Sequence, residues 1–354
     1  FYVSGGPVKA NFFDAWMNVV GGYVMNELPL SDRINLIYGA RVEKADMYYT
    51  GSNTNNQEYE KENVLNELNV LPSFNFLYKV TPKMNIRGAA TRTLARPSFK
   101  EKSLAQIIDP ISGRTFIGNI DLQQTDVTNL DFRYEWYMNR GEILSLGAFY
   151  KDFTNPIETV VYTPETPTNF TPRNAEKGKV YGLEFELKKA FSSEYENKWS
   201  QLSIATNMSY IISEVTMTPK EIEGKTNELR VGQVLGTTRA MQGQSPYIIN
   251  ASINYDGREN GINANMSYNV QGPKLAIVGI GRVADVYTES FHSLNAKVSY
   301  QVGKEKRAKW SIGVTNILAD DKLQVYRSYQ AQDQIFTQLL PNRTFKVGFS
   351  YKLK

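Results

Sequence analysis

The chain of 354 residues contains no cysteine and a single histidine, His292. These absences exclude thiol catalysis and cysteine–histidine zinc sites, and a serine–histidine pair would have to use His292. The chain has no run of about eighteen apolar residues, so we expect neither a transmembrane helix nor a secretory hydrophobic segment at its start. The net charge of +4 is small and the basic residues are interleaved with acidic ones, which gives no support to nucleic-acid binding.

Aromatic residues supply an unusually large share of the apolar content. Hydrophobic residues make up 41% of the chain and aromatic residues 12%, with 22 tyrosines and 17 phenylalanines. Large soluble cores depend more on leucine, isoleucine and valine. The lack of an apolar helix leaves a membrane location open, because a closed β-barrel crosses a bilayer with strands of low individual hydropathy.

Apolar and polar residues alternate with a period of two over long stretches. In the segment 127–138 the even positions read Thr-Leu-Phe-Tyr-Trp-Met and the odd positions Val-Asn-Asp-Arg-Glu-Tyr. After a turn at 138–141 the alternation resumes, and only Phe149 interrupts its polar parity. This pattern predicts a β-hairpin with one apolar face and one polar face that carries charges.

The same test over the whole chain predicts an all-β fold of about thirteen antiparallel strands and no long helix. The expected strands are 12–30, 33–47, 68–81, 83–97, 123–138, 142–160, 175–191, 199–216, 246–256, 261–278, 287–302, 307–319 and 343–353.

The connections between these strands alternate between short and long. The short ones are 29–33, 81–83, 138–141, 192–198, 256–261 and 303–308, and the long ones are 48–67, 98–122, 161–174, 217–245 and 320–342, with 279–286 intermediate. Outer-membrane barrels have short periplasmic turns and long extracellular loops, whereas a soluble Greek-key sandwich has no reason to keep this parity. The sequence therefore predicts an antiparallel up-and-down transmembrane β-barrel segment.

The strand count predicts an incomplete barrel. The last strand of such a barrel descends to the periplasm, which places every short turn on that side and the start of the first strand outside. A complete bacterial barrel has an even number of strands and both ends in the periplasm. We therefore expect residues 1–354 to form the C-terminal portion of a longer barrel.

The two faces of the expected strands differ in chemistry. One face carries an apolar band with aromatic edges that suits lipid, as in Phe74, Phe76, Tyr78, Tyr181, Leu183, Phe185, Leu187, Phe345, Val347, Phe349, Tyr351 and Leu353. The other face carries charges that would cost about 2–4 kcal/mol each against hydrocarbon. These residues are expected to face the lumen: Arg41, Glu43, Arg87, Asp131, Arg133, Glu135, Glu184, Glu186 and Lys188.

Six segments in order carry a family resemblance. They read NFFDAWMNVVGGYVMNELPLSDRINLIYGARVE, LPSFNFLYKVTPKMNIRGAATRTLARPSFKE, NLDFRYEWY with LSLGAFYKDFTNPIE, KGKVYGLEFELKK, MSYNVQGPKLAIVG, and WSIGVTNILADDK with RTFKVGFSYKLK. Together they resemble the barrel domain of TonB-dependent outer-membrane receptors over nearly the whole chain. The final alternation also resembles the terminal signal of outer-membrane proteins, except that Lys354 stands where the usual final aromatic residue would be.

The resemblance implies a 22-stranded barrel filled by an N-terminal plug domain. The plug, the motif that couples it to the inner-membrane TonB complex, and the first strands are expected to precede Phe1. Outer-membrane lipid, the plug and the TonB complex are the implied partners, with a surface lipoprotein or other envelope proteins as further possibilities. The family also implies that the lumenal charges mostly contact the plug rather than a ligand.

The implied function is uptake of a scarce nutrient through the outer membrane of a Gram-negative bacterium, with no enzymatic activity and no cofactor. Iron chelates, vitamins, glycans and peptides are all compatible with the sequence. An alternative is a barrel that does not transport and that acts as a structural or docking component of an outer-membrane assembly.

Ligand recognition is expected in the long loops. The pair Arg92 and Arg96 stands where an ascending strand emerges, and paired arginines suit an anionic ligand. Aromatic faces that suit a sugar or a chelate are Tyr48, Tyr49, Tyr59, Phe116, Tyr162, Phe170, Tyr326 and Tyr329. The adjacent carboxylates Asp320 and Asp321 lack the further oxygen ligands of a calcium loop, so no metal site is predicted.

Overall fold

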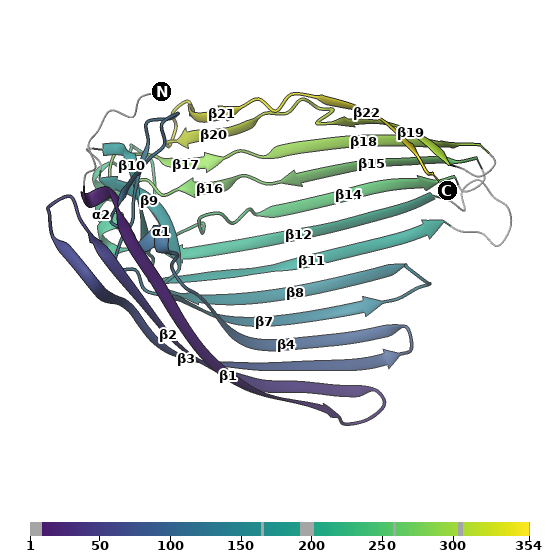
Figure 1. The fold of residues 1–354 in the computed structure, drawn as a ribbon, viewed down its shortest axis with the longest axis horizontal. Helices are drawn as coiled ribbons and strands as arrows, with labels where there is room; N and C mark the ends of the chain where they lie inside the picture. Colours follow the sequence, from purple (N-terminus) through teal and green to yellow (C-terminus); the bar gives the residue numbers. More distant parts are fainter. Residues whose placement is uncertain (1–8, 164–165, 192–201, 258–259, 304–306, 354) are drawn as a thin grey trace.

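The computed structural model describes residues 9–163, 166–191, 202–257, 260–303 and 307–353. Its main element is a curved antiparallel sheet in which thirteen strands follow one another in chain order (Figure 1). These strands are β1 (Phe13–Pro29), β2 (Ile34–Ser52), β3 (Glu58–Thr81), β4 (Met84–Ala95), β7 (Thr125–Trp136), β8 (Ile143–Thr154), β11 (Lys177–Phe191), β12 (Leu202–Thr216), β14 (Tyr247–Asp256), β15 (Ile262–Gln271), β18 (Phe291–Val302), β19 (Ala308–Thr315) and β22 (Thr344–Tyr351). The short strand β13 (Thr238–Arg239) pairs with the end of β12. This up-and-down order confirms the predicted fold class.

The sheet is an open segment of a barrel. Strands β1 and β22 form its two edges, and they do not pair with each other within the described residues. Every strand between them is hydrogen-bonded on both sides to its antiparallel neighbours. Each edge therefore presents a row of backbone groups that a further strand could pair with.

The short connections lie at one end of the sheet and the long ones at the other, as predicted (Figure 1). The expected turn 192–198 lies outside the described residues, as do positions 258–259 and 304–306 of two other turns and 199–201 of an expected strand. Within the described part of the chain, no helix is long and apolar enough to cross a membrane.

The expected long loop 48–67 is wrong, because β2 and β3 continue as a paired hairpin to Ser52 and Glu58. The turn between them is closed by Asn53, whose side-chain oxygen accepts from the backbone N–H of Asn55 (2.9 Å) and Gln57 (3.0 Å). Both faces of this hairpin are largely polar, so the strands continue without the apolar alternation on which the prediction depended.

Three other expected strands are divided by kinks. The segment 142–160 ends as β8 at Thr154, because Asn155 has a positive φ of 55° and Pro156 follows it. The segment 261–278 ends as β15 at Gln271, before Gly272 and a proline. The segment 287–302 begins inside a short loop strand, Asp285–Thr288, and continues as β18 from Phe291. Alternation persists through such kinks, so the period alone does not reveal them.

The long loops form two small sheets at the same end of the barrel segment (Figure 1). One contains β5 (Gln106–Ile108), β6 (Thr115–Ile117), β10 (Thr166–Asn174) and β9 (Ile157–Thr163), and the other contains β16 (Lys274–Ile277), β17 (Asp285–Thr288), β20 (Lys322–Arg327) and β21 (Gln334–Leu339). The short helices η1 (Lys9–Asn11), α1 (Phe99–Lys102) and α2 (Pro219–Asn227) complete the loop region. None of these loop elements was predicted as a separate strand or helix.

The two loop sheets pack against each other. The backbone N–H of Val161 donates to the carbonyl of Val278 (3.0 Å), and the N–H of Val278 donates to the carbonyl of Thr159 (3.1 Å). Arg114 on one side lies 3.5 Å over the ring of Phe336 on the other. The shared core contains buried Val161, Phe170 and Ile280. We call this assembly, residues 96–124, 155–163, 166–176, 217–246, 272–290 and 316–343, the loop module.

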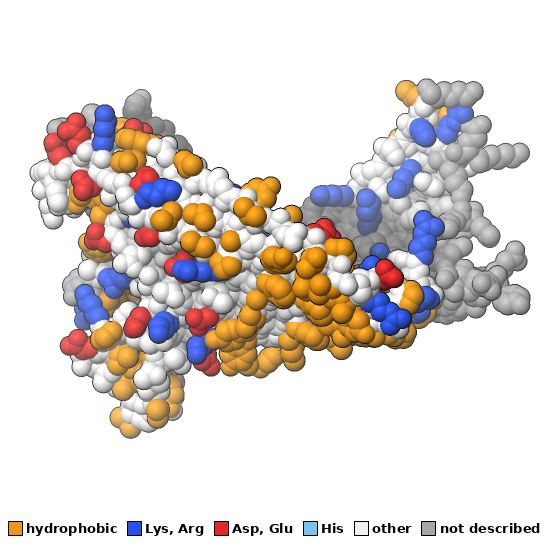
Figure 2. Space-filling model, turned by 90° about the horizontal axis from the view of Figure 1, so that it is seen from below, with side chains coloured by type: hydrophobic (Ala, Val, Ile, Leu, Met, Phe, Trp, Pro, Cys, Tyr) orange, Lys and Arg blue, Asp and Glu red, His pale blue; other side chains and the backbone are white. Residues whose placement is uncertain are grey.

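Register assigns the two faces of the main sheet. Side chains of strands that are two apart meet on one face only: Arg133 on β7 reaches Glu186 on β11, and Arg96 after β4 reaches Glu43 on β2. Because side chains converge on the inner side of a curve, this is the concave face. On the opposite, convex face hydrophobic side chains gather in a band, with charged side chains towards both ends (Figure 2). The residues predicted to face lipid all have the convex parity.

Candidate functional site

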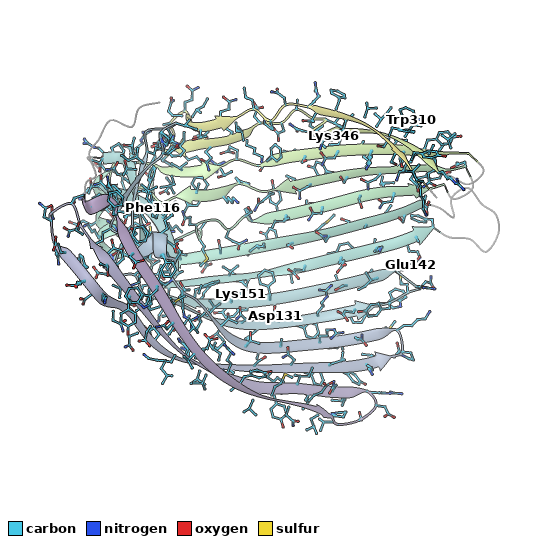
Figure 3. All side chains as sticks on the ribbon, in the orientation of Figure 1. Phe116, Asp131, Glu142, Lys151, Trp310 and Lys346 are labelled. Carbon is cyan, nitrogen blue, oxygen red and sulfur yellow. The ribbon has the colours of Figure 1, made fainter. Side chains whose placement is uncertain are left out.

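The concave face carries every charged residue that the sequence predicted for the lumen. The register pairs Gly39 with Ser73, Ala89 with Asp131 and Gly147 with Glu184, and following this parity across the sheet aligns the whole set. The set is Arg41, Glu43, Arg87, Asp131, Arg133, Glu135, Glu184, Glu186 and Lys188. Asp131 and Lys151 mark this surface on the middle strands in Figure 3.

The ion-pair network of these side chains has two groups, one between β2 and the end of β4 and the other across β4, β7 and β11. Glu43 accepts from Arg41 and, at 2.6 Å, from Arg96. Arg87 donates to Glu135 through its Nε at 2.9 Å. Arg133 donates to Glu186 and also lies 3.5 Å from Glu135. The Arg133–Glu186 pair is partly exposed on both sides, so it stabilises the sheet by about 0–1 kcal/mol.

Two carboxylates on this face lack a partner. Asp131 and Glu184 make no hydrogen bond or ion pair with any described residue, although they line a cavity of 330 Å³ together with Arg87 and Arg133. Gly147 lies beside Glu184 and leaves this space open. The concave face therefore offers both free carboxylates and accessible guanidinium groups to whatever fills the barrel.

A second cavity, of 430 Å³, lies in the loop module, where cations predominate. Its charged lining comprises the basic residues Lys225, Arg230, Arg239, Arg282 and Arg327 and the acidic residues Glu228 and Asp285. These residues come from α2 and the segment after it as far as β13, from the connection before β17 and the first residue of β17, and from β20, which are brought together only by the packing of the loops.

Arg239 lines this cavity and is held by two carboxylates behind it. Its guanidinium forms two hydrogen bonds with the Glu158 carboxylate, at 2.7 and 3.1 Å, and one with Glu221 at 2.6 Å. Burial disfavours the charge of Arg239, but the hydrogen bonds to the two carboxylates outweigh it and raise the pKa of Arg239 above its usual value. Thr218 caps α2 by accepting from the N–H of Glu221 (3.2 Å), which fixes the position of that carboxylate.

The other cations of the cavity differ in how far they are neutralised. The Lys225 ammonium is 2.8 Å from the Asp285 carboxylate. The Arg327 guanidinium donates to Glu289 at 2.6 Å and lies over the ring of Tyr287. Burial, followed by the charge of Asp285, raises the pKa of the Tyr287 hydroxyl. The Arg327 guanidinium therefore lies over a neutral phenol, and Glu289 balances its charge.

Two arginines of the cavity have no carboxylate partner among the described residues. The Arg230 guanidinium donates to the carbonyl of Tyr329, at 2.8 Å, and the exposed side chain of Arg282 makes no hydrogen bond or ion pair with a described residue. Unpaired guanidinium groups at the wall of a cavity can bind carboxylate or phosphate oxygens in a bidentate way.

The structure does not bring the predicted arginine pair together. Arg92 lies on the convex parity and is 3.4 Å from Asp126, whereas Arg96 turns to the concave side and binds Glu43. The two guanidinium groups therefore form ion pairs with different carboxylates on opposite faces of the sheet.

The predicted aromatic residues fall into two groups. Tyr49 and Phe170 are buried, Tyr48 stacks on Trp16, and Tyr59 meets Tyr49 edge-on. Phe116 and Tyr326 also pack within the module, against Lys100 and Phe336 respectively (Figure 3 labels Phe116). Tyr162 and Tyr329 remain exposed, and Tyr329 lines the cation-rich cavity. Three of these rings therefore belong to the β2–β3 hairpin (Tyr48, Tyr49 and Tyr59), three pack in the loop module (Phe116, Phe170 and Tyr326), and only Tyr162 and Tyr329 are exposed.

The sequence-based predictions for the ligand site named aromatic residues and the pair Arg92 and Arg96, and did not include the cationic residues of this cavity. Each of three loop segments, 217–245, 279–286 and 320–342, contains at least one lysine or arginine, and this pattern could have indicated a cationic site. Their grouping could not be read from spacing, since up to about a hundred residues separate them. Within the described residues, no group of three potential metal ligands is present.

Comparison with known proteins agrees with this architecture. The profile of the family described as TonB dependent receptor-like, beta-barrel matches residues 4–317. A search of curated proteins found no match.

Solved structures with the same fold include the ferric yersiniabactin uptake receptor from Yersinia pestis (TM-score 0.63, 17% identity, 96% of this chain and 46% of that one). They also include a ferric citrate transporter in its unliganded form (TM-score 0.65, 15% identity, 96% and 45%) and a copper transporter (TM-score 0.63, 13% identity, 96% and 48%).

The chain spans a little under half the length of these structures. Members of the matched family are transport receptors of the outer membrane of Gram-negative bacteria. The strand order, the two faces of the sheet and the profile match over residues 4–317 lead to one conclusion: the chain belongs to the family of TonB-dependent receptor β-barrels.

Proposed function

We propose that this chain is the C-terminal portion of the barrel of a receptor that takes up an anionic nutrient through the outer membrane by TonB-coupled movement of a plug, without catalysing a reaction. The observation that carries the anionic preference is the loop-module cavity, whose lining holds five basic and two acidic residues. Arg230 and Arg282 would contact the ligand first, because no described carboxylate neutralises them.

The chemistry of the concave face supports the proposal that a plug domain fills the barrel. A polar domain inside the barrel would find the free carboxylates Asp131 and Glu184 and the half-exposed guanidinium groups of Arg87 and Arg133. The open edges of β1 and β22 fit the proposal that further strands complete a 22-stranded barrel.

The proposed anionic ligand is compatible with the ligands of structurally similar transporters, but these do not identify it. The names of three structurally similar transporters refer to ferric yersiniabactin, ferric citrate and copper. Iron chelates with carboxylate or phenolate groups carry the charge that the cavity suits. An anionic glycan, vitamin or peptide would satisfy the same geometry.

A competing proposal is a barrel that docks partners without transport. It is favoured by the tips of the loop module, where Val231 is 97% exposed and Val234 is also almost fully exposed. Apolar side chains presented in this way mark a contact surface for protein when they occur together.

The test compares cells that make the full-length receptor, a deletion strain, and the double variant Arg230→Gln with Arg282→Gln. Each strain is grown with a single limiting nutrient, from a panel that includes ferric citrate, a ferric catecholate, a cobalamin, an acidic oligosaccharide and a peptide. We expect the deletion to abolish growth on one anionic source, the double variant to weaken it, and loss of TonB to reproduce the deletion. The docking proposal replaces transport if the deletion leaves growth on every source unchanged and alters the composition of a co-purified envelope complex instead.

A further inference from the structure

The concave face changes character halfway across the sheet. From β2 to β11 it carries the ion-pair network and the two free carboxylates described above. From β12 to β22 amide and hydroxyl side chains make up most of the same face, with a few apolar residues such as Ile211, Ile248 and Phe291 towards its loop end. We call this second half, the concave-face residues of β12, β14, β15, β18, β19 and β22, the amide wall.

Asparagine side chains bond to one another across the strands of the amide wall. Asn250 donates to Asn207 at 2.6 Å and accepts from Asn269, and Asn265 donates to Asn254 at 2.6 Å. Register places all five on the concave face, because Asn207 pairs with Asn250, Asn250 with Asn269, and Asn254 with Asn265. Each amide still has a further donor or acceptor position for water or a solute.

The amide wall is also depleted in negative charge. Among its described residues the single carboxylate is Asp256, at the turn end of β14, whereas three lysines, Lys297, Lys309 and Lys346, stand on the same face. These lysines make no ion pair with any residue that the structure describes. Lys346 is labelled on β22 in Figure 3.

The two halves of the concave face would hold a polar filling domain with unequal strength. Hydrogen bonds to charged groups stabilise by about 1.5–3 kcal/mol, whereas those between neutral groups contribute about 0.5–1.5 kcal/mol. A body inside the barrel would therefore stay attached to the charged half and separate first from the amide wall. Water replaces neutral amide contacts at little cost, so this is the side at which a gap opens.

We propose that the amide wall lines the path along which an anionic solute passes the barrel. The proposal rests on the transport function argued above and assigns the path to one side of the lumen. The unpaired lysines attract negative charge, the amides exchange hydrogen bonds with carboxylate, phenolate or hydroxyl oxygens, and the lack of carboxylates removes repulsion along most of the wall.

The chain offers a matched pair of positions for testing this. Ser73 on β3 accepts from Asn75 (3.2 Å), and Ser252 on β14 accepts from Asn254 (3.4 Å), so the same serine–x–asparagine unit occurs on both halves. Both serines have concave parity and are half-buried. Because these 354 residues contain no cysteine, Ser73→Cys and Ser252→Cys each introduce one thiol here with little change in volume.

Each variant of the full-length receptor, freed of any cysteine elsewhere, is treated on whole cells with sulfonatoethyl methanethiosulfonate or trimethylammonium-ethyl methanethiosulfonate. Reaction rates are measured with TonB present and absent, in medium that contains the limiting nutrient. We expect TonB to raise the rate severalfold at position 252 and to leave it unchanged at position 73. Equal acceleration at both positions, acceleration at position 73 alone, or acceleration at neither overturns the proposal.

The charge of the probe supplies a second readout. One lysine at about 10 Å in water changes the ratio of the anionic to the cationic reagent by roughly fourfold. Addition of Lys297→Gln and Lys346→Gln should therefore lower the preference of the thiol at 252 for the anionic reagent, without changing the ratio at 73. An unchanged ratio at 252 overturns the anionic assignment of the path. The nutrient-growth test is independent of these rates, so failure of the path and failure of transport are distinguished.

Discussion

Arg239 and Glu158 form a buried two-point ion pair, with nitrogen–oxygen distances of 2.7 and 3.1 Å, that ties the segment after β12 to strand β9 of the loop module. The Arg239 side chain is 10% exposed and that of Glu158 only 3%. Removal of one partner leaves the other charge buried without compensation, so the cost exceeds that of a surface pair.

Arg239→Ala should therefore destabilise the loop module by about 3–5 kcal/mol while the main sheet remains intact. Hydrogen exchange of the segments 157–163 and 217–245 in the full-length receptor would show the loss of protection. Arg92→Ala is the control, since its 3.4 Å pair with Asp126 is partly exposed and contributes about 0–1 kcal/mol. Equal effects of the two substitutions would contradict the central role of Arg239.

Lys102 in α1 predicts a pH dependence of the same module. Its ammonium is buried and donates to the carbonyls of Val64 and Ile120. Burial lowers the pKa of Lys102 to about 8, and the charge of Asp121 only partly opposes this. The unfolded loop, with an ordinary lysine pKa near 10.5, binds more protons than the folded loop between about pH 8 and 10.5, so the stability contribution rises with pH across that window.

The measurement is hydrogen exchange of residues 99–122 between pH 7.5 and 10, corrected for the intrinsic rate. Wild-type protection should increase with pH relative to Lys102→Met, which cannot titrate at this position. A flat difference between the two proteins across the window would rule out Lys102 as the titrating group.

Gly182 on β11 explains why Phe149 interrupts the polar parity of β8. The two residues are register partners, and the Phe149 ring covers the glycine so closely that an added Cβ would lie 2.9 Å from the ring and 2.3 Å from the carbonyl oxygen of Tyr210. Gly182→Ala should cost about 1–3 kcal/mol through overpacking. Gly22→Ala on β1 is the matched control, because nothing lies within 4 Å of its added Cβ.

The fraction of full-length receptor that keeps its compact, heat-modifiable form on gel electrophoresis reports the effect. We expect Gly182→Ala to lose this form at a lower temperature than Gly22→Ala. The same melting temperature for both variants would mean that the sheet relaxes around the new methyl group.

Trp310 on β19 tests whether the convex face contacts lipid. Its ring centroid is 4.6 Å from that of Phe349 on β22, and both belong to the convex band (Figure 3 labels Trp310). Because Trp310 lies near the turn end of its strand, bromine atoms close to the lipid headgroup should quench its fluorescence more strongly than bromine at the chain ends. The difference spectrum between the wild type and Trp310→Phe isolates this signal, and an absence of quenching by either lipid would place the residue away from the bilayer.

The sequence was informative wherever one face of a strand must be apolar and the other polar. The alternation in 127–138 predicted β7 and the face of Asp131, Arg133 and Glu135, and register confirms that these three side chains share the concave parity. It failed for the hairpin that links β2 and β3 beyond Met47, because neither of its faces is required to be apolar. The alternation also continues through the kink at Asn155, because the chain is extended on both sides of the kink. The prediction therefore missed the end of β8.

The sequence by itself determined the number and order of the main strands, the alternation of short and long connections, and the chemistry of the two faces, because a period of two and the separation of lipid from polar surface act locally along the chain. Only the tertiary structure decided which loop residues meet. The cavity joins Lys225, Arg239, Arg282 and Arg327 from three loops, and the concave face joins Arg133 to Glu186 across an intervening strand. Such contacts depend on packing between distant segments and on the curvature of the sheet, and neither leaves a spacing pattern in the sequence.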